Sequence, residues 1–211
     1  ENKGPPNKGQ DPTSMRIIYW NCQGLGNSHT VRALGHYILT YKPMLVGIAE
    51  PKLLFGNWKG FKLSSLVFNI ISSNQHSSSM DHLWVLRHDS IQINSFASRP
   101  RNILISCNNA GKNISVSFVY ASTSYLRRRE LWEDLKATAL RMDQRWMLVG
   151  DFNTVLMPGK KTGTNFHGTA AHEFSECIDS CNLIQIPLVG ADFTWCRYTW
   201  EGKQARKLDR C

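Results

Sequence analysis

Three short apolar runs of this sequence end in acidic or amide side chains, and this pattern constrains the fold more than any other feature. The runs are Met15–Asn21, Met44–Glu50 and Trp146–Gly150, the last being followed at once by Asp151 and Asn153. Each run is short, rich in large apolar residues and bounded by polar residues or glycine, which is typical of a buried strand. Ligands of open α/β sheets bind beyond the strand ends, so these polar side chains are expected to converge.

The chemistry of these side chains indicates a divalent-cation site. Carboxylate and amide oxygens are the hard ligands that Mg²⁺ prefers. Asp151 and Asn153 are two residues apart, so both point to one side if the chain stays extended there. A divalent ion bound beside them could clamp a phosphate and activate a water molecule. Taken singly, each of these residues is more often a helix cap or a turn residue, and that alternative stays open at this point.

The remaining pattern predicts one α/β domain. Apolar residues three and four apart indicate a helix over 30–41, which joins the first two strands into a β-α-β unit. Further helices are expected at 126–142 and around 170–181. Short strands are expected at 66–71, 83–86, 91–96, 103–107, 114–120, 184–186, 193–197 and 205–208. The stretch 1–14 has no large apolar side chain before Met15 and is expected to be a flexible leader to a domain spanning 15–211.

The charge of the chain favours nucleic acid as a partner. The sequence has 25 Lys and Arg residues against 16 Asp and Glu residues, a net formal charge of +9. Arg127, Arg128 and Arg129 form one basic cluster, and Arg197 and Arg210 belong to a second near the end of the chain. Nucleic acid is the usual partner of such a surplus, because each neutralised phosphate releases counterions. The alternative is a solvated basic surface that has no specific partner.

Composition excludes several classes of protein. With 42% hydrophobic residues the chain has ample material for a core, which excludes global disorder. No apolar run approaches the ~18 residues of a membrane span, and no signal peptide is evident. The six cysteines are too sparse for a disulfide scaffold. We therefore expect an intracellular protein with reduced thiols.

Two further motifs are weak signals of cofactor or metal binding. The GLG sequence at 24–26 lacks the third glycine of a dinucleotide fingerprint, because position 29 is His29. His172, Cys177 and Cys181 could ligate a metal from one helix, but a CxxxC pair without a second pair is a weak signal, and buried core cysteines are common. We expect no dinucleotide cofactor, and a packing role for the two cysteines.

Six motifs in order along residues 15–211 resemble the endonuclease/exonuclease/phosphatase superfamily. They are WNCQGLG at 20–26, GIAEPK at 47–52, SFVYAS at 117–122, LVGDFN at 148–153, DFTW at 192–195 and KLDR at 207–210. Within the superfamily, the chain is most similar to the endonuclease domains of plant LINE-type non-LTR retrotransposons. GDFN after a hydrophobic strand is a specific signal, and it is strong when joined to WNCQGLG and a strand that ends in Glu.

The resemblance implies a fold, a reaction and partners. The fold is two packed mixed β-sheets flanked by helices, the four-layer α/β/β/α DNase-I-like sandwich. The reaction is phosphodiester cleavage that depends on Mg²⁺, with Mn²⁺ as the other candidate ion. DNA is the implied partner, a reverse transcriptase domain is expected downstream in an intact element, and a nuclear location follows. Nothing in the resemblance implies a membrane or a dinucleotide.

The resemblance also assigns roles to single positions. The family's metal-binding Glu falls on Glu50, and the Asn of its WN motif, which assists metal or phosphate binding, falls on Asn21. The Asp and Asn of GDFN fall on Asp151, which orients or activates the water, and on Asn153, which holds the scissile phosphate. The other implied site residues are the phosphate-contacting Tyr120, the late-strand Thr194 and Asp209 of the LDR-type motif. From the charge pattern, Arg127 and Arg197 are candidate contacts to the substrate backbone.

The chain also departs from the family pattern. The family ends in two further strands and a Ser-Asp-His motif, and no Ser-Asp-His sequence occurs in these 211 residues. Pro51 follows Glu50 where Thr is usual, and SMDH at 79–82 stands where plant members usually have a Gly-rich stretch. The domain is therefore expected to lack its last strands and to be weak or inactive, since general acid–base help is typically worth ~10²–10⁴-fold in rate. The alternative function is a non-catalytic nucleic-acid-binding or functionless remnant.

Overall fold

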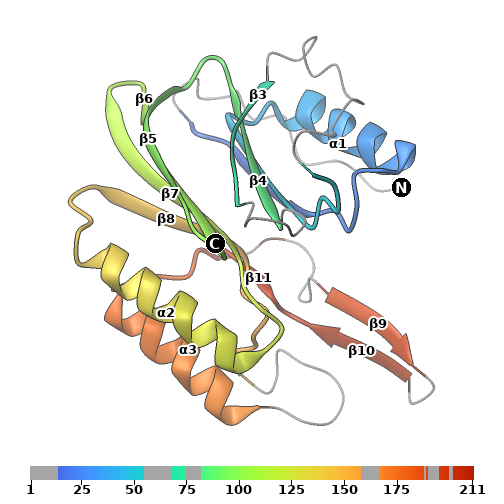
Figure 1. Cartoon of the computed structure of the whole chain (residues 1–211), viewed down its shortest axis with the longest axis vertical. Coiled ribbons are helices and arrows are strands. Elements are labelled where there is room, and N and C mark those ends of the chain that lie inside the picture. The colour runs from blue at the N-terminus through green and yellow to red at the C-terminus, as the bar shows by residue number, and fades with distance from the viewer. Residues whose placement is uncertain are drawn as a thin grey trace.

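The protein is a sandwich of two β-sheets with helices on both outer faces (Figure 1). The computed structural model describes residues 14–54, 68–74, 82–157, 167–187, 189, 195–199 and 202–211. The first sheet has the order β1-β2-β4-β3, with β1 (Ile17–Asn21), β2 (Leu45–Ala49), β3 (Phe68–Ser73) and β4 (Leu83–His88). The second has the order β11-β8-β7-β6-β5, with β5 (Gln92–Ser98), β6 (Asn102–Asn109), β7 (Lys112–Tyr120), β8 (Arg145–Asp151) and β11 (Asp209–Arg210).

Each sheet contains one parallel pair of strands. β1 pairs with β2 in parallel, and β7 pairs with β8 in parallel, whereas the other pairs of both sheets are antiparallel. The crossover between β1 and β2 is α1 (Ser28–Tyr41), and the crossover between β7 and β8 is α2 (Tyr125–Ala139). The carboxyl ends of the two strands in a parallel pair meet at one edge of their sheet. These ends of the two sheets lie at the same end of the sandwich, since Asn21 contacts Asp151 and Tyr120 contacts Glu50.

Helix α1 covers the outer face of the first sheet. Leu34 and Ile38 on its inner side pack against Val46, Ile48 and Trp84 of β2 and β4. Asn27 caps the helix by accepting the main-chain N–H of His29, and Lys42, in a left-handed conformation, ends it just before Pro43. Both faces of β2 are buried, because the alternate residues Leu45 and Ala49 face the other sheet, and a continuous apolar run is what such a strand requires.

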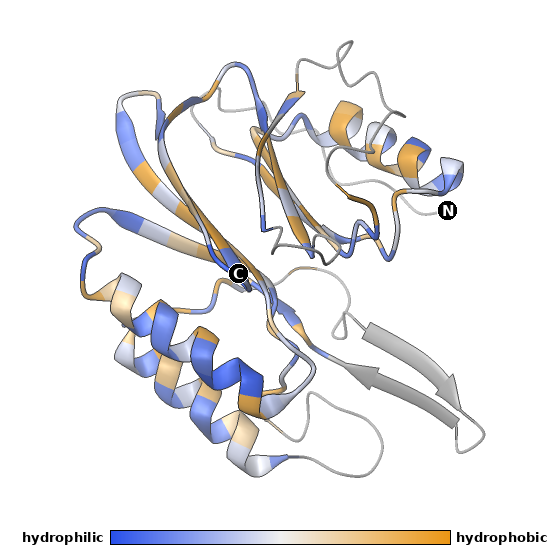
Figure 2. Ribbon diagram, in the orientation of Figure 1, coloured by the Kyte–Doolittle hydropathy of each residue, from blue (hydrophilic) through white to orange (hydrophobic). Residues whose placement is uncertain are grey.

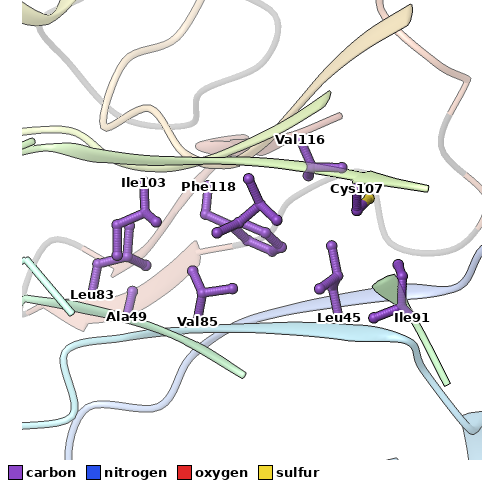
Figure 3. Packing of buried hydrophobic residues seen from close by; sticks show 10 residues of the cluster. Leu45, Ala49, Leu83, Val85, Ile91, Ile103, Cys107, Val116 and Phe118 are labelled. Atoms are coloured by element: carbon purple, nitrogen blue, oxygen red, sulfur yellow. The ribbon is translucent and has the colours of Figure 1, made fainter. Parts of the chain in front are cut away.

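The core between the sheets is apolar and closely packed (Figure 3). Leu45, Ala49 and Val85 of the first sheet meet Val116 and Phe118 of the second. Gly47 on β2 leaves the room that the Phe118 ring occupies, because a Cβ there would overlap the ring. In Figure 2 the hydrophobic colour concentrates along the strands of both sheets, while the helices alternate between hydrophobic and hydrophilic residues.

Helices α2 and α3 (Gly168–Ser180) lie side by side on the outer face of the second sheet (Figure 1). Their shared core holds a stack of three rings, Trp132, Phe152 and Phe174, with centroids 4.8–6.4 Å apart. Cys177 and Cys181 are buried beside these rings, so the packing role expected for the two cysteines is confirmed. No helix among the described residues has the length and apolarity that crossing a membrane requires.

The expected four-layer fold is confirmed, and two of the late elements differ from the prediction. Residues 184–186 form no strand, because Ile184 is 90% exposed and the described main-chain bond of this stretch is a single one, from Ile186 N–H to the Cys211 carbonyl. Of the strand expected at 205–208, only residues 205–206 lie in a strand, and residues 207–208 connect two strands that belong to different sheets. β10 (Gly202–Arg206) pairs with β9 (Trp195–Thr199) in a separate ribbon, while β11 pairs with β8. Residues 1–13 of the expected leader lie outside the described residues.

Candidate active site

Four strands drawn from both sheets bring polar side chains to one end of the sandwich. Asn21 is the last residue of β1, Glu50 directly follows β2, Tyr120 ends β7 and Asp151 ends β8. The parallel registers align these ends, since Asn21 lies opposite Ala49 and Tyr120 lies opposite Asp151. Contacts between Asn21, Glu50 and Asp151 show that the convergence expected for these three residues is present in the structure.

Hydrogen bonds connect the four side chains. The Nδ2 of Asn21 donates to Oε1 of Glu50 at 3.0 Å and lies 3.5 Å from Oδ2 of Asp151. The hydroxyl of Tyr120 donates to the same Oε1 of Glu50 at 2.9 Å. Oε2 of Glu50 is 3.7 Å from the Nζ of Lys52, whose side chain is mostly exposed. Glu50 thus receives donors from both sheets and keeps about a quarter of its side chain exposed, at 25%.

The backbone at the site is in a conformation that ordinary residues rarely adopt. Glu50 has φ +49° and Asn153 has φ +48°, both in the left-handed region. For a non-glycine residue this region carries a conformational cost, and such outliers cluster at functional sites where the surrounding structure enforces them. Two bonds enforce them here. The N–H of Glu50 donates to the His82 carbonyl, and the N–H of Asn153 donates to Oδ1 of Asp151.

Burial and neighbouring carboxylates perturb Asp151. Asp151 is only 6% exposed, and its pKa is raised from 3.8 to about 6, mainly because its carboxylate is desolvated. Asp209 adds to this increase in pKa, because β11 pairs with β8 so that Asp209 lies directly opposite Asp151. The bonds from Asn153 and Asn21 act in the opposite direction and favour the charged form. A carboxyl group tuned in this way is suited to proton transfer near neutral pH.

Two tyrosines of the site stay protonated. Burial, followed by the bond to Glu50, raises the pKa of Tyr120 far above its usual range. Burial and the charge of Asp151 likewise raise the pKa of Tyr19, whose side chain from β1 lies under the site between the two sheets. Both hydroxyls therefore keep their protons at physiological pH.

The donor set fits a divalent cation. The Oδ1 of Asn21 is buried without a hydrogen-bond partner among the described residues, beside the carboxylates of Glu50 and Asp151. No three His, Cys, Asp or Glu side chains of the described part are grouped to hold an ion by themselves. Mg²⁺ does not need such a cage, since it usually keeps several waters and binds one or two carboxylates together with substrate phosphates.

The GDFN segment is held rigidly against β7. A Cβ on Gly150 would overlap the main chain of Val119 on the neighbouring strand, so only glycine allows this close approach. The Ala121 N–H donates to the Asp151 carbonyl at 2.8 Å, and the Asn153 Nδ2 donates back to the Ala121 carbonyl at 2.8 Å. The side chain of Asn153 is thus fixed to the 121–124 loop.

The three consecutive arginines have three different environments. Arg127 is exposed. Arg128 is buried, 5% exposed, and its Nη1 donates to the carbonyls of Ser122 and Thr123. Arg129 forms an ion pair with Glu173 and lies over the ring of Tyr125. Arg128 therefore braces the loop next to Asn153, and its guanidinium is directed into the protein rather than toward solvent.

The other expected contacts are only partly described. Asp209 borders the site through its pairing with Asp151. Thr194 lies outside the described residues, and Arg197 lies on β9, with its side chain outside the described part. The roles carried over for these residues stay predictions.

Sequence reasoning missed His82. This residue precedes β4, and its ring stacks on that of Tyr120, with centroids 6.0 Å apart and planes at 30°. No spacing pattern connects position 82 with position 120, because the contact joins strands of different sheets. The signal available was the departure from the Gly-rich stretch at 79–82, where a larger side chain stands next to the site.

The comparisons with known proteins agree with this geometry. Residues 18–207 match the model of the Endonuclease/Exonuclease/phosphatase family. No curated protein gives a significant match. The endonuclease domain of TRAS1, a telomere-specific non-LTR retrotransposon, is similar in structure, with a TM-score of 0.71 and 12% identity over 93% of this chain and 84% of that chain.

Two further solved structures are similar in fold. The 3′ phosphatase NExo from Neisseria, bound to a product DNA hairpin, has a TM-score of 0.66 and 14% identity over 93% of this chain and 85% of that chain. An AP endonuclease from Archaeoglobus fulgidus has a TM-score of 0.61 and 16% identity over 79% of this chain and 70% of that chain. At these identities the likeness establishes the fold, while the family model covers most of the sequence. The chain belongs to the endonuclease/exonuclease/phosphatase family.

Proposed function

We propose that this protein is a divalent-metal-dependent phosphodiesterase that cuts DNA. The observation that carries the proposal is the hydrogen-bonded group of Asn21, Glu50, Tyr120 and Asp151, which four strand ends of two sheets bring to one end of the sandwich. Family membership supports hydrolysis of phosphate esters, and the DNA-bound structure of NExo supports DNA as the partner.

The chemistry of each side chain suggests its role in the proposed reaction. Glu50 and Asn21 would hold a Mg²⁺ or Mn²⁺ ion, which when bound would neutralise charge on the scissile phosphate and favour a nucleophilic water. Asp151 accepts the proton of the attacking water, a role for which a pKa of about 6 is suited. Tyr120, kept protonated by the rise in its pKa, donates to Glu50 and holds that carboxylate in one orientation.

The finer assignment follows the motif resemblance. We infer that the domain is the endonuclease of a plant LINE-type non-LTR retrotransposon, that an intact element pairs it with a reverse transcriptase, and that it acts on nuclear DNA. The likeness to the TRAS1 endonuclease domain is consistent with this lineage in fold. Cleavage by residues 1–211 alone is expected to be weak, because the family's Ser-Asp-His motif does not occur within them.

A plasmid-nicking assay tests the function. Purified 1–211 is incubated with supercoiled DNA and Mg²⁺, with and without EDTA. We expect slow conversion to open circles that requires the ion and falls by about 10²-fold or more in Asp151→Asn and Glu50→Gln, since each removes a charge that the chemistry uses. Asp143→Asn is the matched control, because Asp143 is an exposed acid before the opposite end of β8.

Three outcomes decide between the hypotheses. Nicking that survives EDTA, or that Asp151→Asn leaves unchanged, contradicts the proposed chemistry. Duplex binding without nicking, even at long incubation with Mn²⁺, favours the non-catalytic nucleic-acid-binding remnant. The absence of both binding and nicking favours a remnant without function.

A further inference from the structure

His82 borders the Glu50–Tyr120 pair although it belongs to none of the site motifs. Its half-buried ring lies against one face of the Tyr120 ring, at 6.0 Å between centroids and 30° between planes. The Tyr120 hydroxyl in turn donates to Oε1 of Glu50 at 2.9 Å. One face of the tyrosine that orients Glu50 is therefore covered by an imidazole from the other sheet.

The main chain of His82 is fixed on both sides. Its carbonyl accepts the N–H of Glu50 at 2.9 Å, and its own N–H donates to Oδ1 of Asn74 at 3.0 Å. Asn74 is 4% exposed and also donates from Nδ2 to the carbonyl of Pro100 at 2.8 Å, which lies in the turn before β6. The position of the His82 ring is thus set by bonds that reach both sheets, rather than by a free loop.

We propose that His82 is a positioning residue of the site, whose ring holds Tyr120 against Glu50 and so sets the orientation of the carboxylate that receives the divalent ion. The proposal rests on the proposed function, and it deepens it by naming the support of the Tyr120–Glu50 bond. It requires the planar ring of His82 and not its proton, since the contact to Tyr120 is a stacked one.

Two histidines of α3 and its N-cap perform different tasks. The Nδ1 of His167 accepts the N–H of Ala170 at the start of α3, and the ring of His167 contacts Tyr125. His172 lies on the exposed side of α3 beside Glu176. His172 therefore provides a matched control: an exposed histidine that contacts no residue of the site.

The test measures ion affinity and the environment of the Tyr120 ring, in addition to activity. Residues 1–211 are prepared as wild type, His82→Ala, His82→Phe and the control His172→Ala, with tyrosine rings labelled with ¹³C. Titration calorimetry gives the Kd for Mn²⁺, and ¹H–¹³C spectra follow the Tyr120 signal, which Tyr120→Phe identifies. The melting temperature of each variant reports whether it is folded.

We expect His82→Ala to raise the Kd for Mn²⁺ about three- to tenfold, as the loss of one aromatic pair implies. His82→Phe, which keeps a planar ring, should stay within about twofold of wild type, and His172→Ala should be unchanged. The Tyr120 signal should move in His82→Ala and remain close to its wild-type position in His82→Phe. If nicking is detected, kcat should fall in His82→Ala with little change in KM.

Three results would overturn the proposal. An equal rise in the Kd for Mn²⁺ in His82→Ala and His82→Phe would show that the imidazole acts through its polar atoms. Unchanged Kd values in both variants would show that the His82 ring does not position Glu50. If wild type binds no Mn²⁺, the proposed metal-dependent function is contradicted, but the Tyr120 spectra still test whether His82 positions Tyr120. A Tyr120 signal at its wild-type position in folded His82→Ala would then contradict the positioning role of His82.

Discussion

The hydroxyl of Tyr120 and the Oε1 of Glu50, at 2.9 Å, form a hydrogen bond that joins the two sheets at the candidate active site. The same oxygen accepts Nδ2 of Asn21 from the neighbouring strand at 3.0 Å. One carboxylate oxygen is therefore engaged by donors from both layers, and the second oxygen lies 3.7 Å from Lys52 Nζ. The orientation of Glu50 therefore depends on how the two sheets pack against each other.

Replacing Tyr120 with Phe removes this inter-sheet donor. We expect the free energy of unfolding to fall by about 1 kcal/mol, the usual net contribution of one such bond. Nicking should fall about tenfold or more, because Glu50 loses part of its orientation. Urea denaturation and the plasmid assay measure the two effects, with Tyr41→Phe on the exposed side of α1 as control. Wild-type nicking by Tyr120→Phe would contradict the role assigned to this bond.

The raised pKa of Asp151 predicts a pH dependence of stability. Its pKa of about 6 in the folded protein lies above the unfolded value of 3.8, so the folded state binds the proton more readily. The free energy of unfolding is then lowered as pH rises from about 4 to 6, by on the order of 2–3 kcal/mol. In Asp151→Asn this loss is absent.

Urea denaturation in EDTA, repeated from pH 4 to 7.5, measures this effect. The stability of Asp151→Asn relative to wild type should increase with pH across this window and level off above about pH 6.5. Asp143→Asn should show no such trend. A difference between Asp151→Asn and wild type that is constant across the whole range would show that Asp151 titrates normally in the folded protein.

Gly150→Ala should destabilise the protein strongly. The added Cβ would overlap the main-chain carbonyl of Val119, and backbone cannot yield as a flexible side chain does. We expect a loss of about 2 kcal/mol or more in the free energy of unfolding. Gly26→Ala is the matched control, because a Cβ there meets nothing within 4 Å. Equal stability of the two variants would mean that β7 and β8 can separate without cost.

Binding to duplex DNA should depend steeply on salt if the basic surface contacts phosphates. Arg127 is exposed, whereas the exposed Arg129 forms an ion pair with Glu173, so Arg127→Gln should reduce the slope of log K against log salt by about 1. Arg145→Gln, at the opposite end of β8 from Asp151, is the control and should leave the slope unchanged. Fluorescence anisotropy over a salt series gives the slopes. An affinity that stays flat from low to physiological salt would contradict backbone binding.

Ion binding and turnover should separate in residues 1–211. Mg²⁺ is expected to raise the melting temperature by a few degrees through Glu50, because a ligand that binds only the folded state stabilises it. Nicking should nevertheless be about 10²-fold or more slower than that of the TRAS1 endonuclease domain assayed alongside, since the Ser-Asp-His motif does not occur in these residues. A comparable nicking rate would show that other groups of this chain supply the missing proton transfer.

The sequence predicted the layers well because burial leaves a local pattern. β2 is apolar at every position since both of its faces are covered, and α1 shows the three-and-four spacing of a helix with one buried face. The pattern failed at 184–186, where Ile184 is apolar but exposed, and hydrophobicity alone does not distinguish a strand from an exposed loop. Nothing in the sequence distinguishes Arg128 from its exposed neighbours, although its guanidinium is buried and donates to two carbonyls.

The sequence by itself determined which polar side chains stand at strand ends, and hence that Asn21 and Glu50, at the ends of neighbouring parallel strands, lie close together. Strand boundaries are local, and parallel pairing aligns the carboxyl ends of neighbouring strands. Only the tertiary structure decided that Asp151 lies beside Asn21, that Tyr120 bonds to Glu50 and that His82 covers Tyr120. Those contacts cross between sheets, and their geometry follows from how the two layers pack face to face, which no spacing within a single strand records.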